Sequence, residues 1–222
     1  MKFGSALTKL GFKKGDVLAT YCPNIAEFPI IYLGVLSLGG ILTTVSSLAT
    51  VHEICLQMKD SKAKYIVTVP PFASNAKQAA EQCGLNEVFV VGEAEGCRPL
   101  SSLLQDDGKS FPTDVRINPK EDVAVLPYSS GTTGRPKGVN LTHFNLTCNI
   151  QQVIDSKEYY QCTPDDKVLG LVPFFHVFGL SVVQGIAFYC GASIISLPKF
   201  EDEIFLQTIL FFIFINSDLI GK

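Results

Sequence analysis

Residues 128–139 read YSSGTTGRPKGV, a run that combines three glycines with several hydroxyl side chains, an arginine and a lysine. Glycine permits positive φ and lets a ligand approach the backbone closely, and successive amide N–H groups in such a turn form a concave anion site. The serine and threonine hydroxyls add further donors, and Lys137 adds a cationic group that suits phosphate. The run therefore predicts a loop that wraps a polyphosphate.

The spacing differs from that of the Walker A loop, G-x-x-x-x-G-K-[ST]. Five positions after Gly131 stands Pro136, and Lys137 is followed by Gly138 rather than by serine or threonine. Proline also interferes with a smooth run into a helix, and the residues after the loop have an extended pattern. The sequence thus disfavours a P-loop NTPase and predicts a phosphate clasp of the strand–loop–strand type.

Two further stretches carry residues that could belong to a site. PFFHVFGL at 173–180 places His176 among apolar neighbours, and LPKF at 197–200 contains Lys199. Taken alone, a histidine in such a setting is more often a core residue than a ligand, and a lone lysine at a strand end is usually solvated. Phe178 and Val182 are four residues apart, which also suits a helix core.

Elements that would position these residues alternate along the chain. The first residues have helical apolar spacing as far as Gly11, and residues 92–119 break the rhythm as a surface excursion. We expect strands at 16–21, 41–45, 64–69, 87–91, 122–128, 167–172 and 192–197, and helices at 25–38, 51–59, 71–83, 141–156 and 177–189. This alternation predicts an α/β fold with largely parallel sheets flanked by helices.

In their order and spacing, the three quoted segments resemble the signature of the adenylate-forming superfamily, which includes acyl-CoA synthetases, 4-coumarate–CoA ligases, luciferases and peptide-synthetase adenylation domains. The upstream text ALTKLGFKKGDVLATYCPN and YLGVLSLGGILTTV is similar as well. The resemblance implies a partial N-terminal AMP-binding domain at 1–208, part of the large domain of such an enzyme, and a divergent apolar tail at 209–222.

By this resemblance the protein is an ATP-dependent acyl-CoA ligase, that is, an acid–thiol ligase. A carboxylate attacks the α-phosphate of ATP and pyrophosphate leaves; the thiol of coenzyme A then displaces AMP from the acyl-adenylate. His176 matches the family histidine beside the carboxylate, and Lys199 matches a lysine near coenzyme A. The residues that the resemblance places on ATP are Ser129, Ser130, Gly131, Thr132, Thr133 and Lys137.

The same resemblance places Phe178 and Val182 in the acyl pocket. Hydroxycinnamate ligases often carry tyrosine at the first position and a hydroxyl residue at the second, whereas both residues are apolar here. A pocket without partner hydroxyls penalises a polar substrate. We therefore expect an apolar acyl chain to be preferred over a phenolic acid.

Several family segments have no counterpart in the 222 residues. They include the Tyr-Gly-x-Thr-Glu segment, whose glutamate helps to hold Mg²⁺, the ribose-binding aspartate and the C-terminal domain with its adenylation lysine. We expect this polypeptide to be an incomplete and inactive fragment of an active enzyme, with no metal site of its own. The alternative is a regulatory isoform without catalytic activity that binds nucleotide or associates with the full-length enzyme.

Composition limits the other functions. A net charge of −3 does not favour binding to nucleic acid. The apolar run at 204–215 is too short to span a bilayer, so we interpret it as a buried helix or strand. The seven scattered cysteines suggest reduced thiols and a cytoplasmic location. Relatives often end in a peroxisomal tripeptide, which leaves a peroxisomal location open for a longer parent protein, although this chain ends at Lys222.

Overall fold

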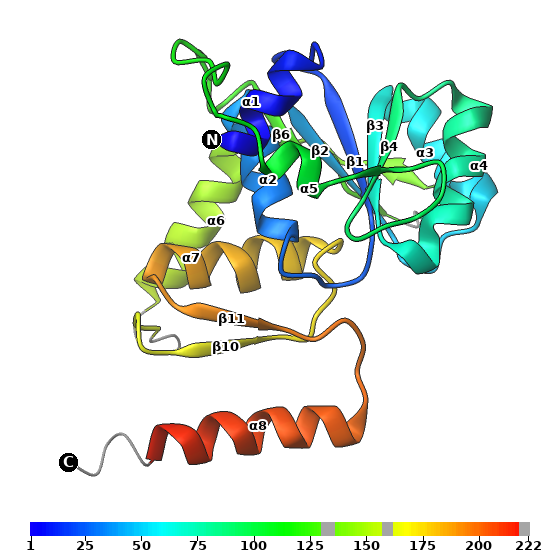
Figure 1. The fold of residues 1–222 in the computed structure, drawn as a ribbon. Helices are drawn as coiled ribbons and strands as arrows, with labels where there is room; N and C mark the ends of the chain where they lie inside the picture. The colour runs from blue at the N-terminus through cyan, green and yellow to red at the C-terminus, as the bar shows by residue number, and fades with distance from the viewer. Residues whose placement is uncertain (130–135, 157–161, 218–222) are drawn as a thin grey trace.

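The computed structural model describes residues 1–129, 136–156 and 162–217, with side chains described as far as residue 212. In this part of the chain, seven strands form one sheet in the order β5-β4-β3-β1-β2-β6-β9 (Figure 1). Neighbouring strands are parallel except for β6 and β9, which confirms the predicted fold class. The strands are β1 (Val17–Tyr21), β2 (Ile41–Val45), β3 (Ala63–Thr68), β4 (Glu87–Val90), β5 (Arg98–Pro99), β6 (Val123–Val125) and β9 (Leu141–Thr142).

Helices cover both faces of this sheet (Figure 1). One apolar cluster joins the sheet to α1, α2, α5 and α6, and a second cluster joins it to α3 and α4. The helices are α1 (Lys2–Lys9), α2 (Phe28–Ser37), α3 (Val51–Ser61), the 3₁₀ turn η1 (Pro70–Phe72), α4 (Ala73–Cys83), α5 (Ser101–Leu104) and α6 (His143–Asp155). The arrangement is therefore a three-layer α/β/α sandwich around a mostly parallel sheet.

Strand β2 shows how the sequence distributes its side chains between the two faces. Successive side chains of a strand point to opposite sides. Leu42 belongs to the first cluster and Val45 to the second, so Thr44 shares a face with Leu42 and Thr43 shares a face with Val45. Both faces are covered, which is why the strand is buried almost throughout despite its two threonines.

Capping boxes fix where two of the helices begin. The hydroxyl of Thr50 accepts the Glu53 N–H, and the Glu53 carboxylate accepts the Thr50 N–H, at the start of α3. Thr142 and Asn145 make the equivalent pair at the start of α6. The predicted helix at 141–156 therefore begins two residues late, because Leu141–Thr142 pairs with β6 as β9.

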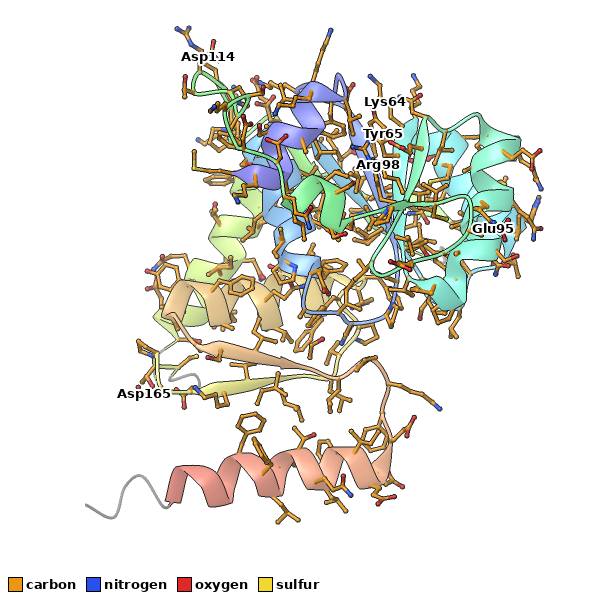
Figure 2. All side chains as sticks on the ribbon, viewed as in Figure 1. Lys64, Tyr65, Glu95, Arg98, Asp114 and Asp165 are labelled. Carbon is orange, nitrogen blue, oxygen red and sulfur yellow. The ribbon has the colours of Figure 1, made fainter. Side chains whose placement is uncertain are left out.

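A second sheet contains β10 (Lys167–Gly170) and β11 (Ser193–Ser196), which run parallel. The chain between them forms η2 (Phe178–Gly185), wound as a π-helix, followed directly by α7 (Ile186–Cys190). The single α-helix predicted at 177–189 is thus two pieces with different winding. In Figure 2 the turn that carries Asp165 lies at the start of β10.

The apolar run predicted as a buried helix or strand forms helix α8 (Asp202–Ser217), but its described side chains are not buried. Leu206, Leu210 and Phe211 are each more than half exposed. In Figure 1, α8 lies beyond the β10–β11 pair, on the side away from α7. The predicted burial was wrong because hydrophobicity gives a side chain a preference for the interior without supplying the element that covers it. Within the described residues, no helix has the length and apolarity needed to cross a membrane.

Ion pairs fix the excursion at 92–119 to the first helix. Lys9 Nζ lies 2.8 Å from Asp106 Oδ2 and 2.9 Å from Asp107 Oδ1. Asp106 also accepts the Gly108 N–H at 2.8 Å. The hydrogen bonds from Lys9, Ser5 and Gly108 hold the pKa of Asp106 well below its ordinary value.

Replacing Asp106 with asparagine is expected to lower the free energy of unfolding in a pH-dependent way. The folded-state pKa is depressed, so the carboxylate stabilises the protein above its unfolded pKa, for which the ordinary value is 3.8, and this contribution is lost as the pH falls toward the folded value. Urea unfolding should show a clear deficit for the variant at about pH 7 that narrows below about pH 4. Asp114→Asn, in the exposed loop of Figure 2, is the control and should unfold like the wild type. A deficit that does not change with pH would contradict this assignment.

Candidate active site

A cleft of about 980 Å³ opens beside the carboxyl end of β2. Ligands of parallel α/β sheets bind outside the carboxyl ends of the strands, so this is where the fold favours a site. Residues from four parts of the chain line it: the end of β2, the helix α3, the hairpin around 128–139 and the segment 175–177. The cleft therefore brings together two of the three sequence segments that carry chemistry.

The hairpin confirms the predicted strand–loop–strand form. β7 (Tyr128–Ser129) pairs antiparallel with β8 (Lys137–Gly138), with Ser129 opposite Lys137. We call residues 128–139 the clasp. A Cβ at Gly138 would lie 3.1 Å from the ring of Tyr128 and 3.1 Å from Leu126 Cδ1, so a larger residue there would require these side chains to shift. The predicted ATP contacts Ser130, Gly131, Thr132 and Thr133 lie outside the described residues.

The clasp is fixed to helix α3 by Tyr128. Its hydroxyl donates a hydrogen bond to the Asp60 carboxylate near the end of the helix. Burial raises the pKa of Tyr128 above its ordinary value, and the hydrogen bond to Asp60 and its charge raise it further. The phenol therefore stays protonated and keeps donating throughout the physiological range.

Lys137 and Ser129 are the two predicted ATP contacts that the structure describes. Both are exposed, and they face each other across the two strands of the clasp. Ser129 lines the cleft, and so do Pro136 and Val139, which flank the lysine strand. Among the described residues no carboxylate pairs with Lys137, so its charge is available to an anion.

The segment before His176 is held by a buried amide, that of Asn24. Its Nδ2 donates to the carbonyls of Gly170 at 2.9 Å and Val172 at 3.0 Å, and its Oδ1 accepts the Phe174 N–H at 2.7 Å. Only 3% of Asn24 is exposed. An unpaired amide would be costly at this depth, so the three bonds fix the end of β10 against the main sheet.

His176 is exposed and lines the same cleft as Ser129. Its Nδ1 accepts the backbone N–H of Phe178 at 3.2 Å. A ring nitrogen that accepts a hydrogen bond carries no proton, so the neutral imidazole holds its proton on Nε2. His176 can thus offer an N–H donor to an oxygen atom in the cleft.

Two carboxylates line the cleft, and both are already engaged. Glu53 accepts hydrogen bonds from the backbone and the hydroxyl of Thr50, and these bonds lower its pKa. Asp60 accepts the Tyr128 hydroxyl. Within the described residues no group of three His, Cys, Asp or Glu side chains is arranged to hold a metal ion. Among the described residues, the two carboxylates of the cleft are therefore held by protein donors and form no cluster for a metal ion.

Three other predicted site residues do not line this cleft. Phe178 is 48% exposed on η2, and Val182 is half-buried one turn further along. Lys199 follows β11, where its ammonium lies 3.5 Å from the Glu201 carboxylate with 79% of the side chain exposed. The roles predicted for Phe178, Val182 and Lys199 stay predictions.

Sequence reasoning missed several residues that hold the site together. Asn24, Gln57 and Asp60 were given no role, and neither were the paired threonines of β2. A visible signal was the placement of Asn24 and Thr43–Thr44 just after or at the end of predicted strands, where a parallel sheet presents its site. Their partners lie far along the chain, so the specific bonds required the fold.

Comparison with known proteins identifies the class. The family model described as AMP-binding enzyme matches residues 1–210. The chain is 38% identical to 4-coumarate–CoA ligase 2 of Solanum tuberosum over 209 aligned residues. The alignment covers 94% of this chain and 38% of that protein. A long-chain-fatty-acid–CoA ligase from Archaeoglobus fulgidus superposes with a TM-score of 0.81 at 27% identity, over 95% of this chain and 40% of the other.

An ATP-bound structure of MatB from Rhodopseudomonas palustris is also similar, with a TM-score of 0.76 and 27% identity over 93% of this chain and 40% of that one. The chain belongs to the AMP-binding enzyme family. It spans about two fifths of the length of these proteins.

Proposed function

We propose that this chain forms the ATP-phosphate and carboxylate side of an acyl-CoA ligase. The observation that carries the proposal is one cleft lined by both the clasp and His176, in a chain of the AMP-binding enzyme family. In the whole protein, a carboxylate oxygen attacks the α-phosphorus of ATP, and the bond to the pyrophosphate oxygen breaks. The thiol of coenzyme A then forms a thioester with the acyl group, and AMP leaves.

The residues of the chain divide this work by charge. The amides and hydroxyls of Ser129, Ser130, Gly131, Thr132 and Thr133 hold the β- and γ-phosphates, and Lys137 neutralises the charge that develops on the leaving pyrophosphate. The Nε2–H of His176 donates to an oxygen of the carboxylate or of the adenylate. Support for this role is the bond from Phe178 N–H to Nδ1, which fixes the tautomer.

The substrate and coenzyme contacts belong to the same proposal. Phe178 and Val182 line an acyl pocket suited to an apolar chain, and Lys199 contacts the phosphates of coenzyme A. The exposed ammonium of Lys199 and its long ion pair, 3.5 Å, leave it able to exchange Glu201 for a phosphate. Mg²⁺ would accompany ATP with ligands from outside the residues described here, since these offer no cluster for it.

The test compares the 222-residue chain with a longer enzyme in which this chain would form the N-terminal part. The isolated chain should bind ATP in equilibrium dialysis but release no pyrophosphate when a carboxylic acid is added, because we propose that it is incomplete as a catalyst. The longer protein should catalyse ATP–pyrophosphate exchange faster in the presence of medium-chain fatty acids than in the presence of 4-coumarate. Failure of the chain to bind ATP would contradict the phosphate role, and faster exchange with 4-coumarate would contradict the apolar pocket.

A second candidate role is regulation by association with the full-length enzyme, in the cytoplasm. The exposed apolar side chains of α8 favour this role, because burying an apolar surface against a partner stabilises the complex. Six cysteines that form no disulfide, at 22, 55, 83, 97, 148 and 190, fit a reducing compartment. Co-purification of tagged full-length enzyme with the chain would support this role, and its absence at micromolar concentrations would exclude it.

A further inference from the structure

Two neighbouring threonines, Thr43 and Thr44, lie near the end of strand β2, and Thr44 lines the cleft. Thr43 is fully buried and Thr44 is 4% exposed. Because side chains alternate along a strand, the two hydroxyls point to opposite faces of the sheet. One threonine can therefore bond to a segment on one face of the sheet, while its neighbour bonds to a different segment on the other face.

Thr43 connects to the clasp. Its Oγ1 donates to the carbonyl oxygen of Leu126 at 2.7 Å. The Leu126 N–H in turn donates to the carbonyl of Leu42 at 2.8 Å, so both backbone groups of Leu126 are bonded to β2. Leu126 stands two residues before Tyr128, the first residue of the clasp. The position of the clasp strand is thus set by β2.

Thr44 connects to the histidine segment. Its Oγ1 donates to the carbonyl oxygen of Phe175 at 2.6 Å, across 131 positions of the sequence. Phe175 directly precedes His176. A displacement of the Phe175 carbonyl would therefore move the imidazole relative to the cleft.

Gln57 on α3 joins the two threonines. Its Nε2 donates to Thr43 Oγ1 at 2.9 Å and to the Thr44 carbonyl at 3.0 Å. Both amide hydrogens are used, and Gln57 is 8% exposed. A buried network in which the members hold one another is rigid, because loss of any one bond leaves a buried polar atom unpaired. We call Thr43, Thr44 and Gln57 the threonine hub.

We propose that the threonine hub consists of positioning residues that set the distance and orientation between strand β7 of the clasp and His176. The purpose of that distance rests on the proposed function: a carboxylate beside the histidine has to reach the α-phosphate while the clasp holds the β- and γ-phosphates. Such transfers are sensitive to displacements of about 1 Å, so a rigid connection between the two parts of the site has catalytic value.

A third threonine provides the matched control. Thr20 on β1 pairs in register with Thr44, and it is 1% exposed. Its Oγ1 has no hydrogen-bond partner among the described residues. Replacing Thr20 with valine keeps the shape and removes a hydroxyl of the same kind from the adjacent strand, but it breaks no hydrogen bond that the structure contains.

The experiment is hydrogen–deuterium exchange of the 222-residue chain, read by mass spectrometry. Thr43→Val should raise exchange in peptides covering 123–129 by about tenfold, because the lost bond held that strand, and should leave 173–180 unchanged. Thr44→Val should produce the reverse pattern. Gln57→Leu should raise exchange in both segments, and Thr20→Val in neither. Thr43→Ser and Thr44→Ser, which retain the hydroxyl, should restore the protection.

A uniform rise that includes strands β3 and β4 would show only a loss of global stability and would overturn the proposal, as would valine variants that match Thr20→Val. The exchange pattern requires no nucleotide. If the wild-type chain fails to bind ATP, the proposed function is contradicted. The role of the threonine hub is still tested by the hydrogen–deuterium exchange pattern. If ATP binds, Thr43→Val should weaken its binding by about threefold or more through the displaced clasp, whereas Thr20→Val should not.

Discussion

Replacing Lys137 with alanine is expected to reduce the affinity of the chain for ATP by about 10- to 100-fold, the range for losing a charge-assisted hydrogen bond. Lys137 is exposed on β8 opposite Ser129, and no carboxylate in the described residues neutralises it. Its removal therefore costs the folded protein little and takes the one ammonium group of the clasp away from the phosphates. Isothermal titration of ATP into the 222-residue chain would measure the loss.

The matched control is Lys59→Ala. Lys59 is exposed on α3 next to Asp60, which lines the cleft, but Lys59 itself does not. Its removal lowers the overall charge equally and should change ATP affinity by less than about threefold, since exposed charges are screened by salt. Lys137→Arg should retain part of the affinity. Equal losses for Lys59→Ala and Lys137→Ala would mean that only the general field of the protein attracts ATP.

Gly179→Ala is expected to destabilise the chain by about 3 kcal/mol, as overpacking against the backbone does at its most severe. A Cβ at this position would lie 2.2 Å from the Pro173 carbonyl oxygen and 2.7 Å from its carbon. That carbonyl accepts the His176 N–H at 3.1 Å, so the displacement would also reach the site. Alanine improves helix propensity over glycine by only about 1 kcal/mol, so the steric cost of the added Cβ exceeds this gain. Urea unfolding would measure the difference.

Gly185→Ala on the same helix is the control. Its Cβ would meet the end of the Ile150 side chain at 2.7 Å, and a flexible side chain can move aside where a carbonyl cannot. Its cost should therefore be well below that of Gly179→Ala. Equal stability of the two variants would show that the backbone at 173–179 relaxes, and that the tight approach of Gly179 does not fix the histidine segment.

Much of the main sheet could be predicted because its signals are local. The strand at 41–45 and the helix beginning at Val51 follow from β-branched runs and from a capping box that lies within four residues. The clasp was predictable for the same reason, since proline and glycine at fixed positions already exclude a helix after the loop. Its two strands pair as the sequence suggested.

The features that the sequence could not place depend on tertiary contacts. Phe178 and Val182 share a face in an α-helix, but η2 is wound as a π-helix, so spacing alone could not place them. The exposure of α8 depends on what lies against it. The threonine hub and Asn24 form bonds across 13 to 150 positions, and no local pattern specifies the partner of a buried amide.

The three hydrogen bonds of Asn24 have a consequence for the order in which the chain folds. Its amide is placed immediately after the first strand, yet its three backbone partners are synthesised roughly 150 residues later. Domains begin to fold from the N-terminal end during translation, and contacts of such long range form slowly. We therefore expect the Asn24 side chain to stay hydrated until residues 170–174 leave the ribosome, and these residues to become ordered well after the first strand.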